Sequence, residues 1–208
     1  MQFSPRIFLK ILKWFLATWL VVFLISTTVW RPSKNFHVVD EGKFYRSAQL
    51  SLDELSDVVD KYGIKTVISL RGAPQTSYWY KKQGDLLDKK GVLFRAVYWT
   101  THYVPNKDEL VSFLTTLKDA PRPILIHCRS GADRTGEAAA IYAIEYMGKS
   151  KDQAISDYLS LATLHVSFIH PAKKFLVRSY QGLDWAINQY DECKEPFRSY
   201  TSKGHCRD

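Results

Sequence analysis

The hydrophobic and polar positions of the chain alternate between strand and helix patterns. The β-branched and apolar runs Thr66 to Leu70 and Ile124 to Ile126 predict strands that are buried on both faces of a parallel sheet. Helical spacing of apolar residues predicts helices from about 52 to 62 and from about 107 to 117. This alternation predicts an α/β domain with a central, largely parallel sheet flanked by helices.

Further elements follow from end signals. The pairs Ser51–Glu54, Asn106–Glu109 and Ser150–Gln153 have the spacing of capping boxes and each predict the start of a helix. Additional strands are predicted at 44–46 and 92–97, and additional helices at 77–90, 137–147 and 172–191.

The first 30 residues follow another pattern. No charged residue occurs from Trp14 to Trp30, and Ile11, Leu12 and a snorkelling Lys13 extend this stretch to the roughly 20 residues that span a bilayer. We therefore expect a basic flank over residues 1–13 and a transmembrane anchor over residues 14–30. A cleaved signal peptide is the alternative, although no small-x-small cleavage site precedes Trp30.

The charges beside this segment predict its orientation. Arg6, Lys10 and Lys13 precede it, and basic flanks tend to stay in the cytoplasm. The expected localisation is a single-pass membrane protein whose folded domain, residues 31–192, is extracytoplasmic, or periplasmic in a bacterium. Residues 193–208 are expected to form a C-terminal tail, in which Cys193 and Cys206 either form a disulfide or remain two thiols.

The net charge of +8 favours anionic substrates or lipid headgroups. No basic run is interleaved with aromatic residues, so nucleic acid is not an expected partner. No Cys and His pairing has the spacing of a zinc site, so no metal site is predicted.

The chemistry is concentrated at residues 127–136. The strand ending at Ile126 leads directly through this segment into a helix, which is the layout of a phosphate-binding loop. A helix N-terminus stabilises a thiolate, so Cys128 is the predicted nucleophile. Arg134, six residues later, is the predicted bidentate phosphate clamp. The predicted phosphate-binding residues are Arg129, Ser130, Gly131, Ala132 and Thr135, with His127 orienting the loop.

The segment from His127 to Gly136 resembles the HCxxGxxRTG signature of the cysteine-based protein tyrosine phosphatase superfamily, in its dual-specificity branch. Phe44 to Gln49 is similar to the YRSAQ segment of atypical and bacterial members, and Val67 to Arg71 resembles their second conserved strand. The resemblance implies that residues 31–192 are a catalytic domain with a compact α/β fold. It also implies hydrolysis of phosphoesters through a phosphocysteine intermediate, without metal or cofactor.

The chain departs from this pattern at the general acid. The stretch where the family carries an Asp, residues 98–103, contains no carboxylate, and Asp108 and Glu109 have the positions of capping residues. Asp133 is the favoured candidate, because myotubularins carry an Asp at the matching loop position. His102 and Asp108 are alternatives, and the structural interpretation of Asp133 is a residue that shapes the loop.

Other polar residues carry weaker signals. Arg46 and Arg71 are interpreted as members of structural ion pairs rather than pocket-lining bases, and His165 and His170 have less support as site residues.

The leading function is a membrane-anchored phosphatase, with the bilayer as one partner. Its substrate is either a phosphorylated protein (phosphotyrosine, phosphoserine or phosphothreonine) or an anionic phospholipid headgroup. A soluble phosphate is a further substrate class. The first alternative is a pseudophosphatase that senses phosphate without turnover, since the usual acid is missing. A rhodanese-type sulfur transferase also has a cysteine loop after a strand, but Arg134 to Gly136 fit phosphate chemistry better.

Overall fold

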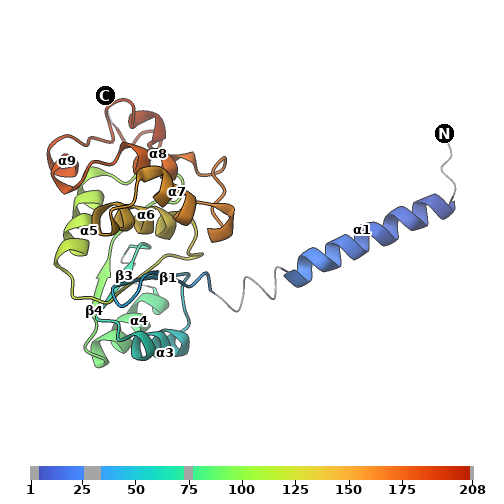
Figure 1. Cartoon of the computed structure of the whole chain (residues 1–208), viewed down its shortest axis with the longest axis horizontal. Helices are drawn as coiled ribbons and strands as arrows, with labels where there is room; N and C mark the ends of the chain where they lie inside the picture. The colour runs from blue at the N-terminus through green and yellow to red at the C-terminus, as the bar shows by residue number, and fades with distance from the viewer. Residues whose placement is uncertain (1–4, 26–33, 73–76, 207–208) are drawn as a thin grey trace. The chain divides into compact units, whose positions relative to one another are not determined.

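Figure 1 shows the computed structural model of the chain, in which residues 5–25, 34–72 and 77–206 are described. The chain divides into two units, residues 1–34 and residues 35–208. The first unit contains the helix α1 (Pro5–Ile25), and the second contains the sheet and the remaining helices.

The predicted transmembrane helix is wrong. In the described part of the chain, no helix combines the length and the apolar character that crossing a membrane requires. The helix α1 begins at Pro5, so Arg6, Lys10 and Lys13 lie within it. Its uncharged part, Trp14 to Ile25, is about 18 Å long at 1.5 Å per residue, against a hydrocarbon core of about 30 Å.

The rest of the predicted anchor, residues 26–30, lies outside the described residues. The same finding overturns the single-pass membrane localisation and the extracytoplasmic placement that depended on it.

The second unit is built on a five-stranded sheet with the strand order β1-β2-β5-β3-β4. The strands β2, β5, β3 and β4 are parallel, and β1 pairs antiparallel with β2 at the edge. The sheet is therefore largely parallel, as predicted. The strands are β1 (His37–Asp40), β2 (Phe44–Ser47), β3 (Thr66–Ser69), β4 (Leu93–Ala96) and β5 (Ile124–His127).

Side chains of the strands alternate between the two faces of the sheet. In β5, Leu125 belongs to a core cluster that contains Leu55 and Leu87, whereas Ile124 and Ile126 belong to a larger cluster on the other face. Two helices, α3 (Leu52–Tyr62) and α4 (Tyr78–Lys89), cover the first face (Figure 1). The helices of the second face are α5 (Lys107–Asp119), α6 (Asp133–Met147), α7 (Lys151–Tyr158), α8 (Pro171–Ser179) and α9 (Leu183–Asn188).

Two details differ from the sequence-based expectation. The strand β1 was not predicted, because two of its four side chains are exposed and its pattern is weak. The single helix predicted over residues 172–191 is two helices, α8 and α9. Gly182, with φ of 101°, directly precedes α9 and breaks the helical path.

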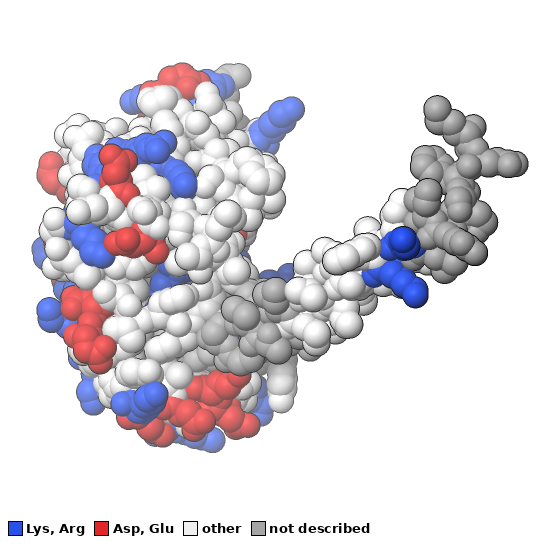
Figure 2. Space-filling view, turned by 45° about the vertical axis from the view of Figure 1, so that its right-hand side comes forward, with Lys and Arg blue, Asp and Glu red and all other residues white. Residues whose placement is uncertain are grey.

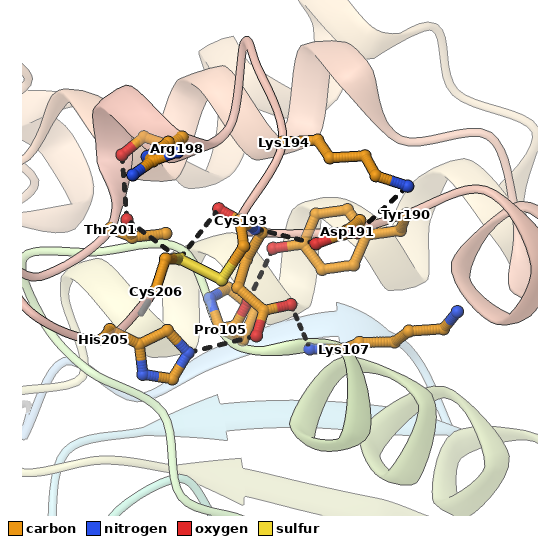
Figure 3. The surroundings of a disulfide bond; sticks show 11 residues. Pro105, Lys107, Tyr190, Asp191, Cys193, Lys194, Arg198, Thr201, His205 and Cys206 are labelled. Atoms are coloured by element: carbon orange, nitrogen blue, oxygen red, sulfur yellow. Dashed lines mark hydrogen bonds and ion pairs between the residues drawn. A yellow bond between two sulfur atoms is a disulfide. The ribbon is translucent and has the colours of Figure 1, made fainter. Parts of the chain in front are cut away.

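The C-terminal tail packs against the segment that precedes α5. A disulfide joins Cys193 and Cys206, whose Cα atoms are 5.4 Å apart (Figure 3). Glu192 accepts a hydrogen bond from the backbone N–H of Lys107 at 2.9 Å and contacts Nε2 of His205 at 3.1 Å. Of the two possibilities for the tail cysteines, the structure has the disulfide.

Figure 2 shows the charged side chains on one face of the molecule. Basic and acidic residues are interspersed over the part of that face formed by the α/β unit, so the net positive charge does not gather into one large basic area there.

Candidate active site

The cysteine loop, residues 128–132, connects the central strand β5 to the N-terminus of α6. Because β5 lies between β2 and β3, the loop emerges from the middle of the carboxyl edge of the sheet. Cys128 is 1% exposed, and its Sγ accepts a hydrogen bond from the backbone N–H of Gly131 at 3.2 Å. The thiol therefore lies at the positive end of α6, where a thiolate is stabilised.

The carbonyl groups of the loop are bound from outside it. The carbonyl of Arg129 accepts from the backbone N–H of Gln49 at 3.2 Å. The carbonyl of Ser130 accepts from Nδ2 of Asn35 at 3.3 Å. The carbonyl of Gly131 accepts from the guanidinium of Arg46. With these carbonyls bound from outside the loop, the backbone N–H of Gly131 is directed at Sγ, as expected of an anion cradle.

Gly131 is required by this seating. Its φ is +72°, and a Cβ atom there would lie 2.7 Å from the backbone N of Ala48 and 2.8 Å from the carbonyl carbon of Ser47. The loop thus rests directly on the end of β2, and only glycine permits both the conformation and the close approach.

Arg46 supports the cysteine loop through a hydrogen bond from its guanidinium. It is fully buried, and besides Gly131 its guanidinium donates to the carbonyl of Tyr158 at 3.2 Å. Burial lowers its pKa to about 10, so it stays cationic near neutral pH. The sequence-based interpretation of Arg46 as an ion-pair residue is wrong in its partners, because both of these bonds go to backbone carbonyls.

Arg134 lies in the first turn of α6, and its guanidinium is bonded to two backbone carbonyls. Its Nη1 donates to the carbonyl of Leu70 at 3.0 Å and to that of Trp99 at 3.3 Å. Its Nε has no hydrogen-bond partner within the described ranges. The guanidinium is therefore oriented by the segments that follow β3 and β4, on the side of the loop opposite β2.

A chain of hydrogen bonds runs from Arg71 to the cysteine loop. Arg71 donates to Oε1 of Gln49 at 3.0 Å, and Gln49 donates to Oε1 of Gln83 at 2.7 Å. The amide of Gln83 donates to Nε2 of His127 at 2.8 Å, which leaves Nδ1 of that ring to donate to the carbonyl of Cys128 at 3.4 Å. Burial lowers the pKa of His127 to about 4, so the ring is neutral at neutral pH.

This chain of hydrogen bonds includes two residues that the sequence analysis did not identify as site residues. Gln49 follows β2 and Gln83 belongs to α4, so their hydrogen bond joins segments that are distant in the sequence. The sequence offered a partial signal, since Gln49 closes the YRSAQ segment.

Thr135 is buried in the first turn of α6, and within the described ranges its hydroxyl has no hydrogen-bond partner. The role of Thr135 as a phosphate-binding residue therefore stays a prediction. Ala132 is also buried, and its carbonyl accepts the bond from Gly136 that opens the helix, at 2.8 Å.

The three candidate acids occupy different surroundings. Asp133 is buried, with Oδ1 at 2.8 Å from Nδ1 of His165 and Oδ2 at 3.6 Å from Nε2 of His170. Asp108 is exposed in the first turn of α5. His102 is exposed, and its ring lies 4.7 Å from that of His170. Only Asp133 lies in the segment that joins the cysteine loop to Arg134.

Glu109, which lies next to the candidate acid Asp108, is a capping residue as expected. Its side chain accepts from the backbone N–H of Asn106 at 2.9 Å in a complete capping box.

Comparison with known proteins agrees with this geometry. Residues 15–170 match a family model described as DSP-PTPase phosphatase fused to NAD+ kinase. No curated protein matches the sequence.

Among solved structures, P. aeruginosa TpbA is 23% identical over 74% of this chain and 89% of its own, with a TM-score of 0.56. The core catalytic domain of the PP-IP phosphatase SIW14 from S. cerevisiae, in complex with citrate, is 21% identical over 71% of this chain and 85% of its own, with a TM-score of 0.57. At this identity the two structures establish a shared fold.

Proposed function

Because the chain belongs to the family described as DSP-PTPase phosphatase fused to NAD+ kinase, and is thus a phosphatase of the protein tyrosine and dual-specificity type, we propose that it hydrolyses phosphate monoesters on proteins through a phosphocysteine intermediate. Cys128 is the nucleophile, Arg134 the clamp and Asp133 the general acid. The observation that carries the proposal is the cysteine loop, whose carbonyls are bound from outside while the N–H of Gly131 is directed at Sγ.

In the first step, the Cys128 thiolate attacks phosphorus and forms the S–P bond while the bond from phosphorus to the ester oxygen breaks. The electron pair of the broken bond goes to the leaving oxygen, which takes the proton of Asp133. The loop N–H groups and the fork of Arg134 donate to the non-bridging oxygens, on which negative charge is held throughout the transfer.

In the second step, the Asp133 carboxylate takes a proton from water as the water oxygen attacks phosphorus. The S–P bond breaks and its electron pair returns to the sulfur. The N–H of Gly131, at 3.2 Å from Sγ, stabilises the thiolate that leaves. Thr135 is the residue proposed to add a second hydrogen bond to that thiolate.

Phosphotyrosine is the protein substrate we favour. Cys128 is almost fully buried, and a phosphate on an aromatic ring reaches further into a recessed loop than one on serine. At the mouth of the site, the guanidinium of Arg71 lies 3.9 Å from the centre of the Trp79 ring, so a flat and partly apolar surface is available to the substrate. The similar structure of TpbA, at 22% identity, has been solved in complex with pTyr.

The phospholipid alternative depended on the predicted membrane anchor and has lost that argument. The phosphate-sensor alternative depended on the missing acid, and the placement of Asp133 beside Arg134 weakens it. Both alternatives remain as outcomes of the test.

The test uses the full chain with three substrates, which are a phosphotyrosine peptide, a phosphoserine peptide of the same flanking sequence, and phosphatidylglycerophosphate in micelles. We expect the phosphotyrosine peptide to give the highest kcat/KM and Cys128→Ser to lower kcat at least 1,000-fold, on the order of the loss from removing other enzyme nucleophiles. Equal turnover in Cys128→Ser would contradict the mechanism.

Each remaining outcome is also informative. A higher kcat/KM for the lipid would overturn the protein substrate class. Tight binding of inorganic phosphate without turnover of any substrate would make the chain a sensor. In all cases circular dichroism of the Cys128→Ser variant checks that its fold is intact.

A further inference from the structure

Asp133 lies between two imidazole rings. Oδ1 is 2.8 Å from Nδ1 of His165 and Oδ2 is 3.6 Å from Nε2 of His170. The side chains are 11% exposed for Asp133, 0% for His165 and 14% for His170, so little water reaches the group. A carboxylate in such a site needs donors on both oxygens, and here each oxygen has a ring nitrogen as its neighbour.

The opposite nitrogen of each ring has no protein partner. Among the residues that the structure describes, Nε2 of His165 and Nδ1 of His170 are buried and lack a hydrogen bond. When each neutral ring directs its N–H toward Asp133, the far nitrogen is unprotonated. Each ring therefore keeps one basic nitrogen, and the cluster can accept a proton at three places.

Two further elements bring charges to this cluster. From α8, Nζ of Lys173 lies 2.9 Å from Oε2 of Glu137 and 2.7 Å from the carbonyl of Tyr103. From the segment after β4, the exposed ring of His102 lies 4.7 Å from that of His170. Among the described residues, Lys173 and His102 are the further charged or titratable groups that act on His170.

The balance of these groups keeps His170 neutral at neutral pH. Its pKa is lowered by burial first, then by His102, His165 and Lys173, against the opposing effect of Asp133. A neutral ring beside a carboxylate can donate a hydrogen bond to it and can still accept a proton.

We propose that His165 and His170 are positioning residues for Asp133, and that the three side chains hold one catalytic proton as a unit which Asp133 delivers to the leaving oxygen. The proposal rests on the proposed function and deepens it. His165 holds the carboxyl group of Asp133 in position. His170 adds a further proton acceptor on the side of the cluster where His102 lies.

The proton balance needs no other reactant. In the first step the cluster gives one proton to the leaving oxygen, and in the second it takes one from the attacking water. The pH profile of kcat/KM therefore reports the cluster as a whole.

The sign of the effect follows from counting the places that accept the proton. A proton that can reside on Asp133 or on either ring is bound more tightly than one restricted to fewer groups. Replacing His170 by Gln keeps an N–H donor for Asp133 but removes one basic nitrogen. The proton is then lost at lower pH, and activity that needs it declines earlier as pH rises.

The experiment compares pH profiles of kcat/KM for the wild type and His170→Gln in the full chain. The matched control is His205→Gln, which alters a similar imidazole and carboxylate pair, with Glu192 at 3.1 Å, on the tail. Two substrates are used, phosphotyrosine peptide with a poor leaving group and p-nitrophenyl phosphate with a good one. We expect the high-pH limb for the peptide to move to lower pH in His170→Gln, by about 0.2 pH unit where the three places hold the proton equally, with the control unchanged.

The second substrate distinguishes a positioning role of His170 from a general loss of structure at the site. With p-nitrophenyl phosphate the leaving oxygen needs little protonation, so the high-pH limb of kcat/KM, which reports the first step, should move less in His170→Gln than it does with the peptide. An unmoved limb with equal losses on both substrates would assign His170 a structural role and overturn the proposal. An inactive wild type would instead contradict the proposed function, so the two failures are distinguishable.

If His170→Gln does not fold, NMR titration of the histidine ring protons replaces it. The Asp133 charge opposes the lowering of the His170 pKa, so Asp133→Asn should move that titration to lower pH. An unchanged titration would overturn the shared proton.

Discussion

Gly131 is the residue whose lack of a Cβ atom matters most for the conformation of the cysteine loop. We expect Gly131→Ala to lower kcat/KM at least 100-fold, because the added Cβ would lie 2.7 Å from the backbone N of Ala48 and would displace the cysteine loop. The measurement is steady-state turnover of the phosphotyrosine peptide. Gly42→Ala is the matched control, since Gly42 has φ of +71° but a Cβ added there would meet no atom within 4 Å.

The control separates two costs of the same substitution. Both changes strain a left-handed backbone by about 1–2 kcal/mol, but only Gly131 adds a collision with β2. Equal activity losses in the two variants would show that strain alone, and not the seating of the loop, is responsible.

At individual residues, the sequence pointed to the proposed reacting groups but not to the contacts that hold them. Cys128, Arg134 and Asp133 were singled out because their chemistry is local to one strand, loop and helix. Arg46 and His165 were not, because their bonds to Gly131 and Asp133 join segments that are distant in the sequence. No local pattern encodes such contacts.

The helices α6 and α8 are joined by a buried ion pair. Glu137 and Lys173 are both 0% exposed, and burial raises the pKa of Glu137 to about 7 in spite of the lysine. We expect Lys173→Met to lower the free energy of unfolding by about 3–5 kcal/mol near pH 8, because a buried carboxylate is left without its partner. Urea denaturation measures this loss.

The pH dependence of the same contact has a definite sign. The folded pKa of Glu137 is above its unfolded value of 4.5, so its contribution is most favourable below about pH 4.5 and is lost as pH rises through about 7. The penalty of Lys173→Met should therefore be smaller at pH 5 than at pH 8. Lys149→Met, which breaks a partly exposed pair with Asp157, should cost less than about 1 kcal/mol at either pH. A similar cost for both lysines would contradict this account.

Among the elements, those with strong local end signals were predicted best. Complete capping boxes open α3, α5 and α7 at the expected residues. The start of α6 was expected at Glu137 but lies at Asp133, because the cysteine loop turns directly into the helix. The break between α8 and α9 was missed, since a single glycine in an otherwise helical pattern is a weak signal.

For the molecule as a whole, the tail disulfide supports the segment that leads into α5. Tyr200 lies within the loop closed by Cys193 and Cys206, and its carbonyl accepts a hydrogen bond from the backbone N–H of Val104 at 3.1 Å. We expect dithiothreitol to lower the free energy of unfolding by about 3 kcal/mol, the value typical of a loop of this length.

The measurement uses the Cys128→Ser background, so that the buried thiol does not react. The double variant Cys193→Ser and Cys206→Ser should have the same stability with and without dithiothreitol. Identical unfolding curves for the oxidised and reduced parent chain would refute a stabilising role for the disulfide.

At this same scale the sequence misjudged the N-terminal segment. The transmembrane helix was predicted from the length of the uncharged run that begins at Trp14. The helix that forms begins at Pro5 and includes Lys10 and Lys13. Where a helix starts is decided by backbone hydrogen bonding, which does not follow the boundary of the apolar run.

The central position of β5 has a consequence for how the protein is made. Ile124 pairs with Phe44 on one side and with Thr66 on the other, so β2 and β3 have no contact as neighbours until β5 is inserted between them. During synthesis, the two halves of the sheet must wait for the strand that carries the nucleophile. The loop that carries the nucleophile can therefore be seated only after contacts between segments distant in the sequence have formed.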